Sequence, residues 1–113
     1  SETQYSFGTR FEHGAGTNPE ELIAAAHAGC FAMALSAQLE SAGMVAQRLE
    51  VTATVKLEKQ EAGWAVTESH LDLTAHIPEA DPEKFEAAAK SAKTGCPVSK
   101  LLNAKITMSA KLG

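Results

Sequence analysis

The segment that most constrains the fold of this chain is a nearly unbroken apolar run from Leu22 to Leu35. Only His27, Gly29 and Cys30 interrupt its aliphatic and aromatic residues. A helix that is apolar on all sides is buried on all sides. The chain has 113 residues, the size of a single domain. In such a chain the run predicts a central helix with a sheet on one side and a further layer on the other.

The ends of this helix are marked by its flanking residues. Asn18 can cap the first turn, and Pro19 suits the first helical position. Glu20 and Glu21 place negative charge at the positive end of the helix dipole. Gly43 is the expected stop, because glycine readily ends a helix in a left-handed conformation. We therefore expect a helix from Pro19 to about the residue before Gly43.

The rest of the chain predicts four strands and two shorter helices. Apolar and polar residues alternate in the strand segments, which is typical of strands with one face on the core and one face in water. Each shorter helix has a proline at its first position. The strands are expected at 3–13, 48–60, 64–77 and 105–112, and the helices at 80–95 and 96–103. This order predicts an α+β fold: an antiparallel sheet, the long buried helix and a second helix on one face.

Composition excludes some classes of function and indicates a partner subunit. The net charge is −4 and the ten Lys and Arg residues are scattered, which argues against nucleic acid as a partner. No run of eighteen apolar residues and no signal peptide is visible, so we expect no membrane partner and a cytoplasmic location. Alanine dominates the apolar residues and aromatics make up only 5%. Because alanine buries little area, a second subunit is expected to complete the core.

The two cysteines, Cys30 and Cys96, differ in their local chemistry. Cys30 lies about twelve residues into its helix, beyond the reach of the helix dipole, and burial raises a thiol pKa. A Cys30 thiolate would need a cation from elsewhere, and Arg10 precedes the helix. Cys96 comes directly before Pro97 at the predicted start of a short helix, where a thiolate is favoured. Local physics makes Cys96 the more acidic thiol and leaves open which cysteine attacks first.

Three interpretations of these cysteines remain open at this point. They can be two unrelated buried thiols, since cysteine is among the most buried residue types. They can belong to a metal site with His27 and a further histidine, although the spacing of zinc motifs is missing. They can also form a redox pair that closes a disulfide. His27 alone is read as a packing residue, Arg10 as a surface charge and Glu20 as part of the helix start.

Two motifs carry a resemblance to a known family. The sequence TNPEELIAAAHAGCFAMAL at 17–35, followed by GCPVSKLL at 95–102, resembles the OsmC/Ohr family of thiol-dependent hydroperoxide peroxidases. The segment FGTRFE at 7–12 also fits this family, and the OsmC branch is closer than the organic hydroperoxide resistance branch. The resemblance extends over nearly the whole chain and implies an OsmC-like domain over residues 1–113. Family members carry further N-terminal strands, which this chain is expected to lack.

The resemblance implies a function and a set of site residues. Cys30 would be the catalytic cysteine and Cys96 its resolving partner, with Arg10 and Glu20 positioning and charge-compensating the thiolate. The implied activity is peroxidase chemistry that reduces organic hydroperoxides, and hydrogen peroxide less well, in oxidative or osmotic stress defence. It needs an external thiol or dithiol reductant and no metal, haem or flavin. The family forms intertwined homodimers.

Helix geometry adds a consequence for Glu20. It lies ten residues before Cys30 in one helix, so the two are about 15 Å apart along the axis. An antiparallel partner helix could bring the second subunit's Glu20 to Cys30, which suggests an active site shared across a dimer. The alternative to an enzyme is an α+β module that binds an apolar ligand or partner, in which the cysteines are incidental.

Overall fold

The computed structural model describes residues 18–113 and contains three helices and three strands in that range. The predicted strand at 3–13 and Arg10 lie outside the described residues. The elements are α2 (Pro19–Ser41), β1 (Arg48–Gln60), β2 (Gly63–His76), α3 (Pro82–Gly95), α4 (Pro97–Leu101) and β3 (Lys105–Leu112). Each corresponds to a segment predicted from the sequence, with bounds that differ by a few residues at most.

The caps of the two longer helices form as the sequence predicts. The Asn18 side chain accepts a hydrogen bond from the Glu21 backbone N–H at 3.0 Å, which satisfies one of the free donors of the first turn of α2. The Asp81 carboxylate does the same for α3, accepting from the N–H groups of Glu83 and Lys84. After α2 the chain turns at Gly43, whose φ of 79° suits a residue without a Cβ.

The sheet has the order β1-β2-β3 and is mixed. β1 and β2 form the predicted antiparallel hairpin, with Arg48 opposite His76 and Gln60 opposite Gly63. β3 pairs with β2 in parallel, so the expectation of a wholly antiparallel sheet is wrong for this strand. The physical reason is the connection. Both α3 and α4 lie between β2 and β3, and a crossover of this length returns the chain to the same end of the sheet.

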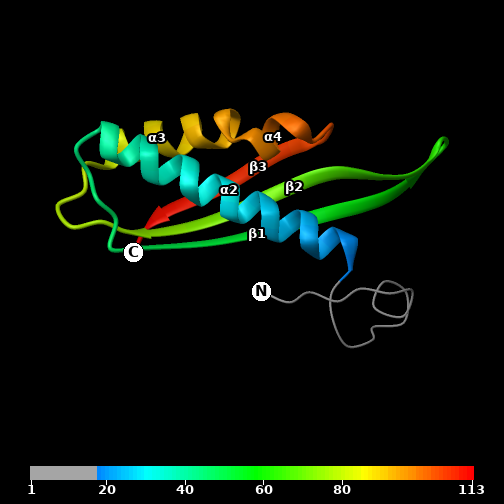
Figure 1. The fold of residues 1–113 in the computed structure, drawn as a ribbon, viewed down its shortest axis with the longest axis horizontal. Helices are drawn as coiled ribbons and strands as arrows, with labels where there is room; N and C mark the ends of the chain where they lie inside the picture. The colour runs from blue at the N-terminus through cyan, green and yellow to red at the C-terminus, as the bar shows by residue number, and fades with distance from the viewer. Residues whose placement is uncertain (1–17) are drawn as a thin grey trace.

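The helices cover one face of the sheet, which makes a two-layer α+β arrangement (Figure 1). Leu71, Leu73 and Ala75 of β2 are buried toward the helices, and the residues between them face the other side because side chains alternate along a strand. The helices contribute a second set of apolar side chains to the same core. These are Phe31, Leu35, Leu39, Phe85, Ala88, Ala89 and Ala92.

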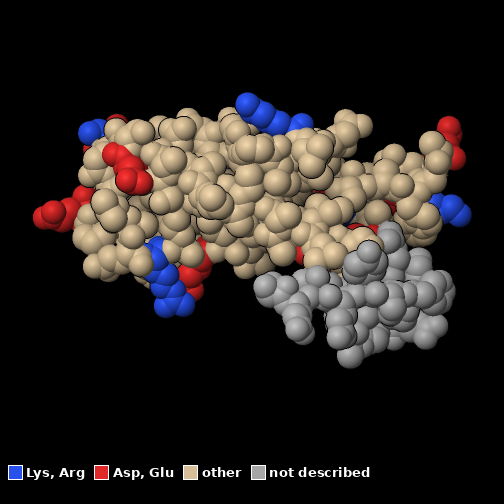
Figure 2. Space-filling model, in the orientation of Figure 1, with Lys and Arg blue, Asp and Glu red and all other residues tan. Residues whose placement is uncertain are grey.

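Within residues 18–113 helix α2 is buried on one side only, so the described part of a single chain does not meet the prediction of burial on all sides. The buried stripe consists of His27, Phe31, Leu35 and Leu39. The opposite stripe is exposed, and Met33 on it is 77% exposed. Figure 2 shows that the broad face over α2 has few charged side chains, which lie mostly toward the rim of this face. The helix therefore presents an apolar surface that the described residues, 18–113, do not cover.

By length and composition alone, α2 is also able to cross a membrane. The core helix of a globular domain meets the same two criteria. Here α2 packs against β1, α3 and α4 and contributes its stripe to the shared core. These contacts make it the core helix of the fold.

The core predicts a clear difference between two apolar residues. Phe31 is fully buried, so Phe31→Ala should lower the free energy of unfolding by about 3–5 kcal/mol. Leu101 is 78% exposed, and Leu101→Ala should change it by about 0.5 kcal/mol or less. Urea denaturation of both variants measures the difference. Equal losses would contradict the assignment of the core.

Candidate active site

The fold brings the two cysteines together although 65 residues separate them in sequence. Cys30 lies in the middle of α2, and Cys96 immediately precedes α4. Helices α2 and α4 are in contact, and the two cysteine thiols lie close enough for each to shift the pKa of the other. Both are free thiols. Cys30 is partly accessible, while Cys96 is fully buried.

The surroundings of Cys30 disfavour its thiolate. Burial raises the pKa of the Cys30 thiol, and the hydrogen bond with Cys96 raises it further. A hydrogen bond from the backbone N–H of Val98 opposes this only in part. Within residues 18–113 the one arginine is Arg48, which pairs with Glu50 at 3.3 Å on β1. The described part of the chain therefore gives Cys30 no arginine.

Cys96 has the opposite tendency. Burial by itself raises the pKa of this thiol, but hydrogen bonds from Cys30 and from Ser99 and Val98 outweigh it, so the pKa lies below its ordinary value. The side chain does not cap α4 in the ordinary hydrogen-bond geometry. Its sulfur nevertheless lies close to the first N–H groups of that helix, which favour negative charge. The prediction that Cys96 is the more acidic thiol agrees with these contacts.

His27 joins the cysteine region to the sheet, which goes beyond the packing role predicted for it. Its ring is fully buried. Nδ1 lies 2.6 Å from Ser69 Oγ on β2, and Nε2 lies 2.7 Å from Ser99 Oγ on α4. Burial lowers the pKa of His27, so the ring is neutral near neutral pH. The sequence signal for this role was a polar residue inside an apolar run. The sequence could not identify its partners, because Ser69 and Ser99 are 42 and 72 positions away.

The other predicted site residues are not brought to the cysteines within the described chain. Glu20 lies in the first turn of the continuous helix α2, about 15 Å along the axis from Cys30. Arg10 lies outside the described residues. For a metal site, residues 18–113 contain no cluster of three His, Cys, Asp or Glu side chains suited to hold an ion.

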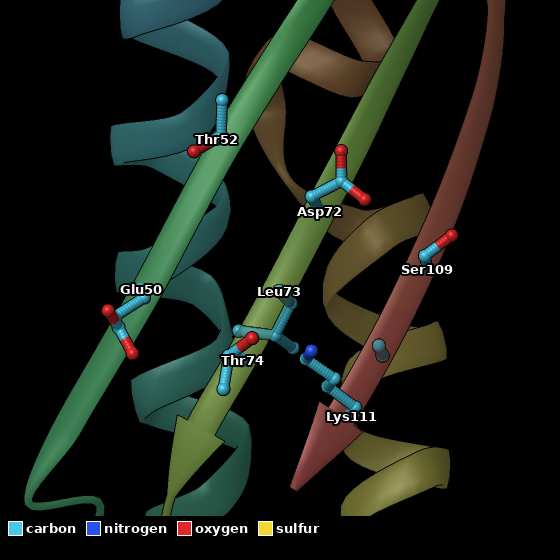
Figure 3. Close-up of a pocket in the computed structure, with 8 residues that line it drawn as sticks. Glu50, Thr52, Asp72, Leu73, Thr74, Ser109 and Lys111 are labelled. Carbon is cyan, nitrogen blue, oxygen red and sulfur yellow. The ribbon is translucent and has the colours of Figure 1, made fainter. Parts of the chain in front are cut away.

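A separate hollow lies on the open face of the sheet. Its volume is about 350 Å³, and its lining includes Glu50, Asp72 and Lys111. Figure 3 shows these side chains on β1, β2 and β3, with the helices behind the sheet. Most of its lining residues are polar, and it lies on the side of the sheet away from α2 and α4. It is therefore not part of the cysteine site.

Comparison of the sequence with known proteins shows the family to which this chain belongs. The sequence model of the family described as OsmC-like protein matches residues 12–111. Peroxiredoxin OsmC of Escherichia coli (strain K12) is 48% identical over 108 residues, which are 96% of this chain and 76% of that protein. The chain belongs to the OsmC-like protein family.

Solved structures of the OsmC-like family share the fold. An OsmC-like protein of unknown function from Vibrio cholerae has a TM-score of 0.77 at 17% identity, covering 85% of this chain. This chain spans only 65% of that protein's length. The organic hydroperoxide resistance protein OhrB of Bacillus subtilis has a TM-score of 0.74 at 26% identity, covering 94% of this chain and 78% of that one. The predicted α+β, OsmC-like fold class is thus confirmed.

The buried neutral His27 predicts a loss of stability in mild acid. Its pKa is below the ordinary 6.5 in the folded chain, so the unfolded chain binds a proton more readily. The stabilisation is complete above pH 6.5 and falls as the pH drops below that value, by at most about 1.4 kcal/mol per pH unit. Urea denaturation at pH 7.5 and at pH 5 measures this difference.

The matched variants are His27→Gln and His70→Gln. The first should lose this part of the pH dependence, because it removes the buried ring. His70 hydrogen-bonds Thr107 on the other face of the sheet, so the second variant should keep it. A wild-type slope retained in His27→Gln would show that His27 is not the group responsible.

Proposed function

We propose that this protein reduces organic hydroperoxides through a Cys30 sulfenic acid and a Cys30–Cys96 disulfide. That the chain is a peroxidase follows from its 48% identity with peroxiredoxin OsmC over most of its length. The observation that supports the two-cysteine mechanism is the proximity of the Cys30 and Cys96 thiols, which lie on contacting helices and shift each other's pKa. A disulfide can form only where two sulfur atoms can approach each other closely.

The proposed reaction has three steps. The Cys30 thiolate attacks the terminal peroxide oxygen, so that an S–O bond forms, the O–O bond breaks and the alkoxide leaves as an alcohol after taking up a proton. The Cys96 thiolate then attacks the Cys30 sulfur, and the displaced hydroxide takes up a proton to become water. An external dithiol returns both thiols by disulfide exchange and is itself oxidised. No metal, haem or flavin is needed.

Accessibility and acidity support this division of roles. Cys30 is partly accessible and Cys96 is fully buried, so a peroxide reaches Cys30 first. Cys96 has the lowered pKa, which favours the thiolate that resolves a sulfenic acid. The first step still requires a Cys30 thiolate. We assign its stabilisation to the Arg10 guanidinium, which would also hydrogen-bond the developing alkoxide.

Organic hydroperoxides are the proposed substrates because Cys30 lies among apolar side chains. Its helix is rich in alanine, and Cys30 itself packs against the hydrophobic core. Burial of an alkyl chain contributes about 0.8 kcal/mol per methylene, which hydrogen peroxide cannot gain. The free state of both thiols fits a reducing compartment. We therefore place the protein in the cytoplasm.

The proposed active unit is a homodimer in which α2 packs antiparallel on its twin. The exposed stripe of α2 contains Ala25, Gly29 and Met33, and small residues let helix axes approach closely. If the partner's Glu20 lies beside Cys30, the two helices cross midway, near Ala25. The crossing point then falls within the alanine-rich part of the exposed stripe. This arrangement would cover that stripe and place Glu20 where it can hold Arg10.

Thiol titration tests the mechanism. A slight excess of cumene hydroperoxide should remove both free thiols of the reduced wild-type chain and leave an internal disulfide, visible by mass spectrometry. Cys30→Ser should abolish hydroperoxide consumption. Cys96→Ser should still be oxidised at Cys30 but should stop at the sulfenic acid. Survival of both thiols in the wild type would favour a binding module with incidental cysteines.

Subunit mixing tests the shared site. Cys30→Ser subunits and Glu20→Ala subunits are each expected to be nearly inactive, and mixing them should restore activity well above their sum. In the heterodimer one site has an intact Cys30 and receives Glu20 from the other subunit. The matched control mixes Glu20→Ala with the double variant Cys30→Ser/Glu20→Ala, where no Glu20 is present. Equal activity in both mixtures would argue against sharing.

A further inference from the structure

The proposed reaction does not use His27. This residue lies three positions before Cys30 in α2, and its ring is fully buried. Both of its ring nitrogens are hydrogen-bonded, to Ser69 Oγ at 2.6 Å and to Ser99 Oγ at 2.7 Å. Burying a polar ring in an apolar core is costly unless its hydrogen bonds are made. A leucine at this position would pack at less cost, so the polar arrangement calls for a role beyond packing.

Ser99 connects His27 to the resolving cysteine. Its hydroxyl hydrogen-bonds His27 Nε2 at 2.7 Å, and Ser99 lies three residues after Cys96 at the start of α4, where it helps to lower the pKa of that thiol. Cys96 in turn lies close enough to Cys30 for each thiol to shift the pKa of the other. The result is a buried chain of contacts from Ser69 on β2, through His27 and Ser99, to the two sulfur atoms.

When Cys96 is a thiolate, the number of available protons determines which group donates in each of these hydrogen bonds. A serine hydroxyl has one proton, so Ser99 can donate to the thiolate only if it accepts from His27. Nε2 must then carry the ring proton, and Nδ1 accepts from the Ser69 hydroxyl. In this arrangement the ring nitrogens of His27 and the hydroxyl groups of Ser69 and Ser99 all have hydrogen-bond partners. If His27 instead accepted from Ser99, the hydroxyl would present no proton to the sulfur.

We propose that His27 is a positioning residue that, through its Nε2–H, holds the Ser99 hydroxyl as a hydrogen-bond donor to the Cys96 thiolate. This keeps Cys96 ready to attack an oxidised Cys30, and in that respect the inference rests on the proposed function. His27 touches neither the peroxide nor the reacting sulfur atoms in this scheme. Its effect passes through one hydroxyl group.

The other charged groups near this part of the fold point elsewhere. Glu68 and His70 of β2 both hydrogen-bond Thr107 on the opposite face of the sheet. On α3, Lys90 pairs with Glu86 at 3.4 Å on the surface, and Lys93 is only partly buried. Lys100 of α4 is exposed. Among the described residues, Cys30 is thus the titratable group next to Cys96, and His27 is connected to it through Ser99.

Ultraviolet titration of the Cys96 thiolate tests the proposal without any peroxide. The parent is Cys30→Ser, which leaves Cys96 as the only thiol and keeps a hydroxyl next to it. Adding Ser99→Ala should move the Cys96 titration to higher pH, because the hydroxyl donor is lost. His27→Leu should move it in the same direction. Ser99→Thr and His27→Gln each retain the needed donor and should restore part of the shift.

Rapid-mixing kinetics supply a second readout, the rate of disulfide formation, in protein that retains both cysteines. Loss of a hydrogen bond to a charged group should slow disulfide formation after hydroperoxide oxidation on the order of tenfold in Ser99→Ala. The preceding oxidation of Cys30 should keep its rate. A structural defect alone would affect both steps and would not be reversed by Ser99→Thr.

The outcomes separate this inference from the proposed function. An unchanged Cys96 titration in Ser99→Ala overturns the role of His27 and Ser99, even if the wild type consumes hydroperoxide. A shifted titration, restored by Ser99→Thr, supports that role even if no hydroperoxide is consumed. If His27→Leu does not fold, Ser99→Ala alone decides, since it removes a single oxygen atom. Failure of His27→Gln to restore any part of the His27→Leu shift also overturns the proposal.

Discussion

The hydrogen bonds of the buried His27 ring connect three elements of this fold. Nδ1 binds Ser69 on β2 and Nε2 binds Ser99 on α4, while the ring itself belongs to α2. An unsatisfied buried donor or acceptor costs about 1–3 kcal/mol, so the helix and the sheet must keep the register that satisfies both nitrogens. That register places the start of α4, and therefore Cys96, against Cys30.

The same helix has two apolar surfaces, of which residues 18–113 cover only one. The stripe from His27 to Leu39 packs into the core, and the opposite stripe remains exposed. Apolar area left in water is unfavourable at about 25 cal/mol per Å². In the proposed homodimer a second copy of α2 would cover this stripe, and Glu20, which lies far from Cys30 within one chain, would lie close to the partner's cysteine across a crossing at Ala25. Core packing, the cysteine site and the proposed subunit contact thus all depend on one helix.

The pKa values of the two cysteines shift in opposite directions because their surroundings in α2 and at the start of α4 differ. Cys30 lies within a helix whose N–H groups are already hydrogen-bonded, and burial raises its pKa. Cys96 lies next to Cys30 at the start of a helix where N–H groups are free to favour a thiolate, and these contacts lower its pKa although burial raises it. The accessible thiol is therefore the less acidic one. This arrangement suits a peroxide-facing cysteine that depends on an external cation and a buried cysteine that is ready to resolve it.

The sequence by itself determined the elements of this fold, since caps, prolines and hydrophobic alternation are local signals. Asn18, Pro19 and Gly43 mark α2, and the alternation over 48–60 marks β1. It also predicted that Cys96 is the more acidic thiol, but the largest contribution to the lowered pKa comes from Cys30, which only the tertiary structure brings there. Only the tertiary structure decided the parallel pairing of β3, the exposure of one face of α2 and the bonds from His27 to Ser69 and Ser99. These depend on how distant segments pack, and periodicity within a segment carries no information about which segment lies opposite.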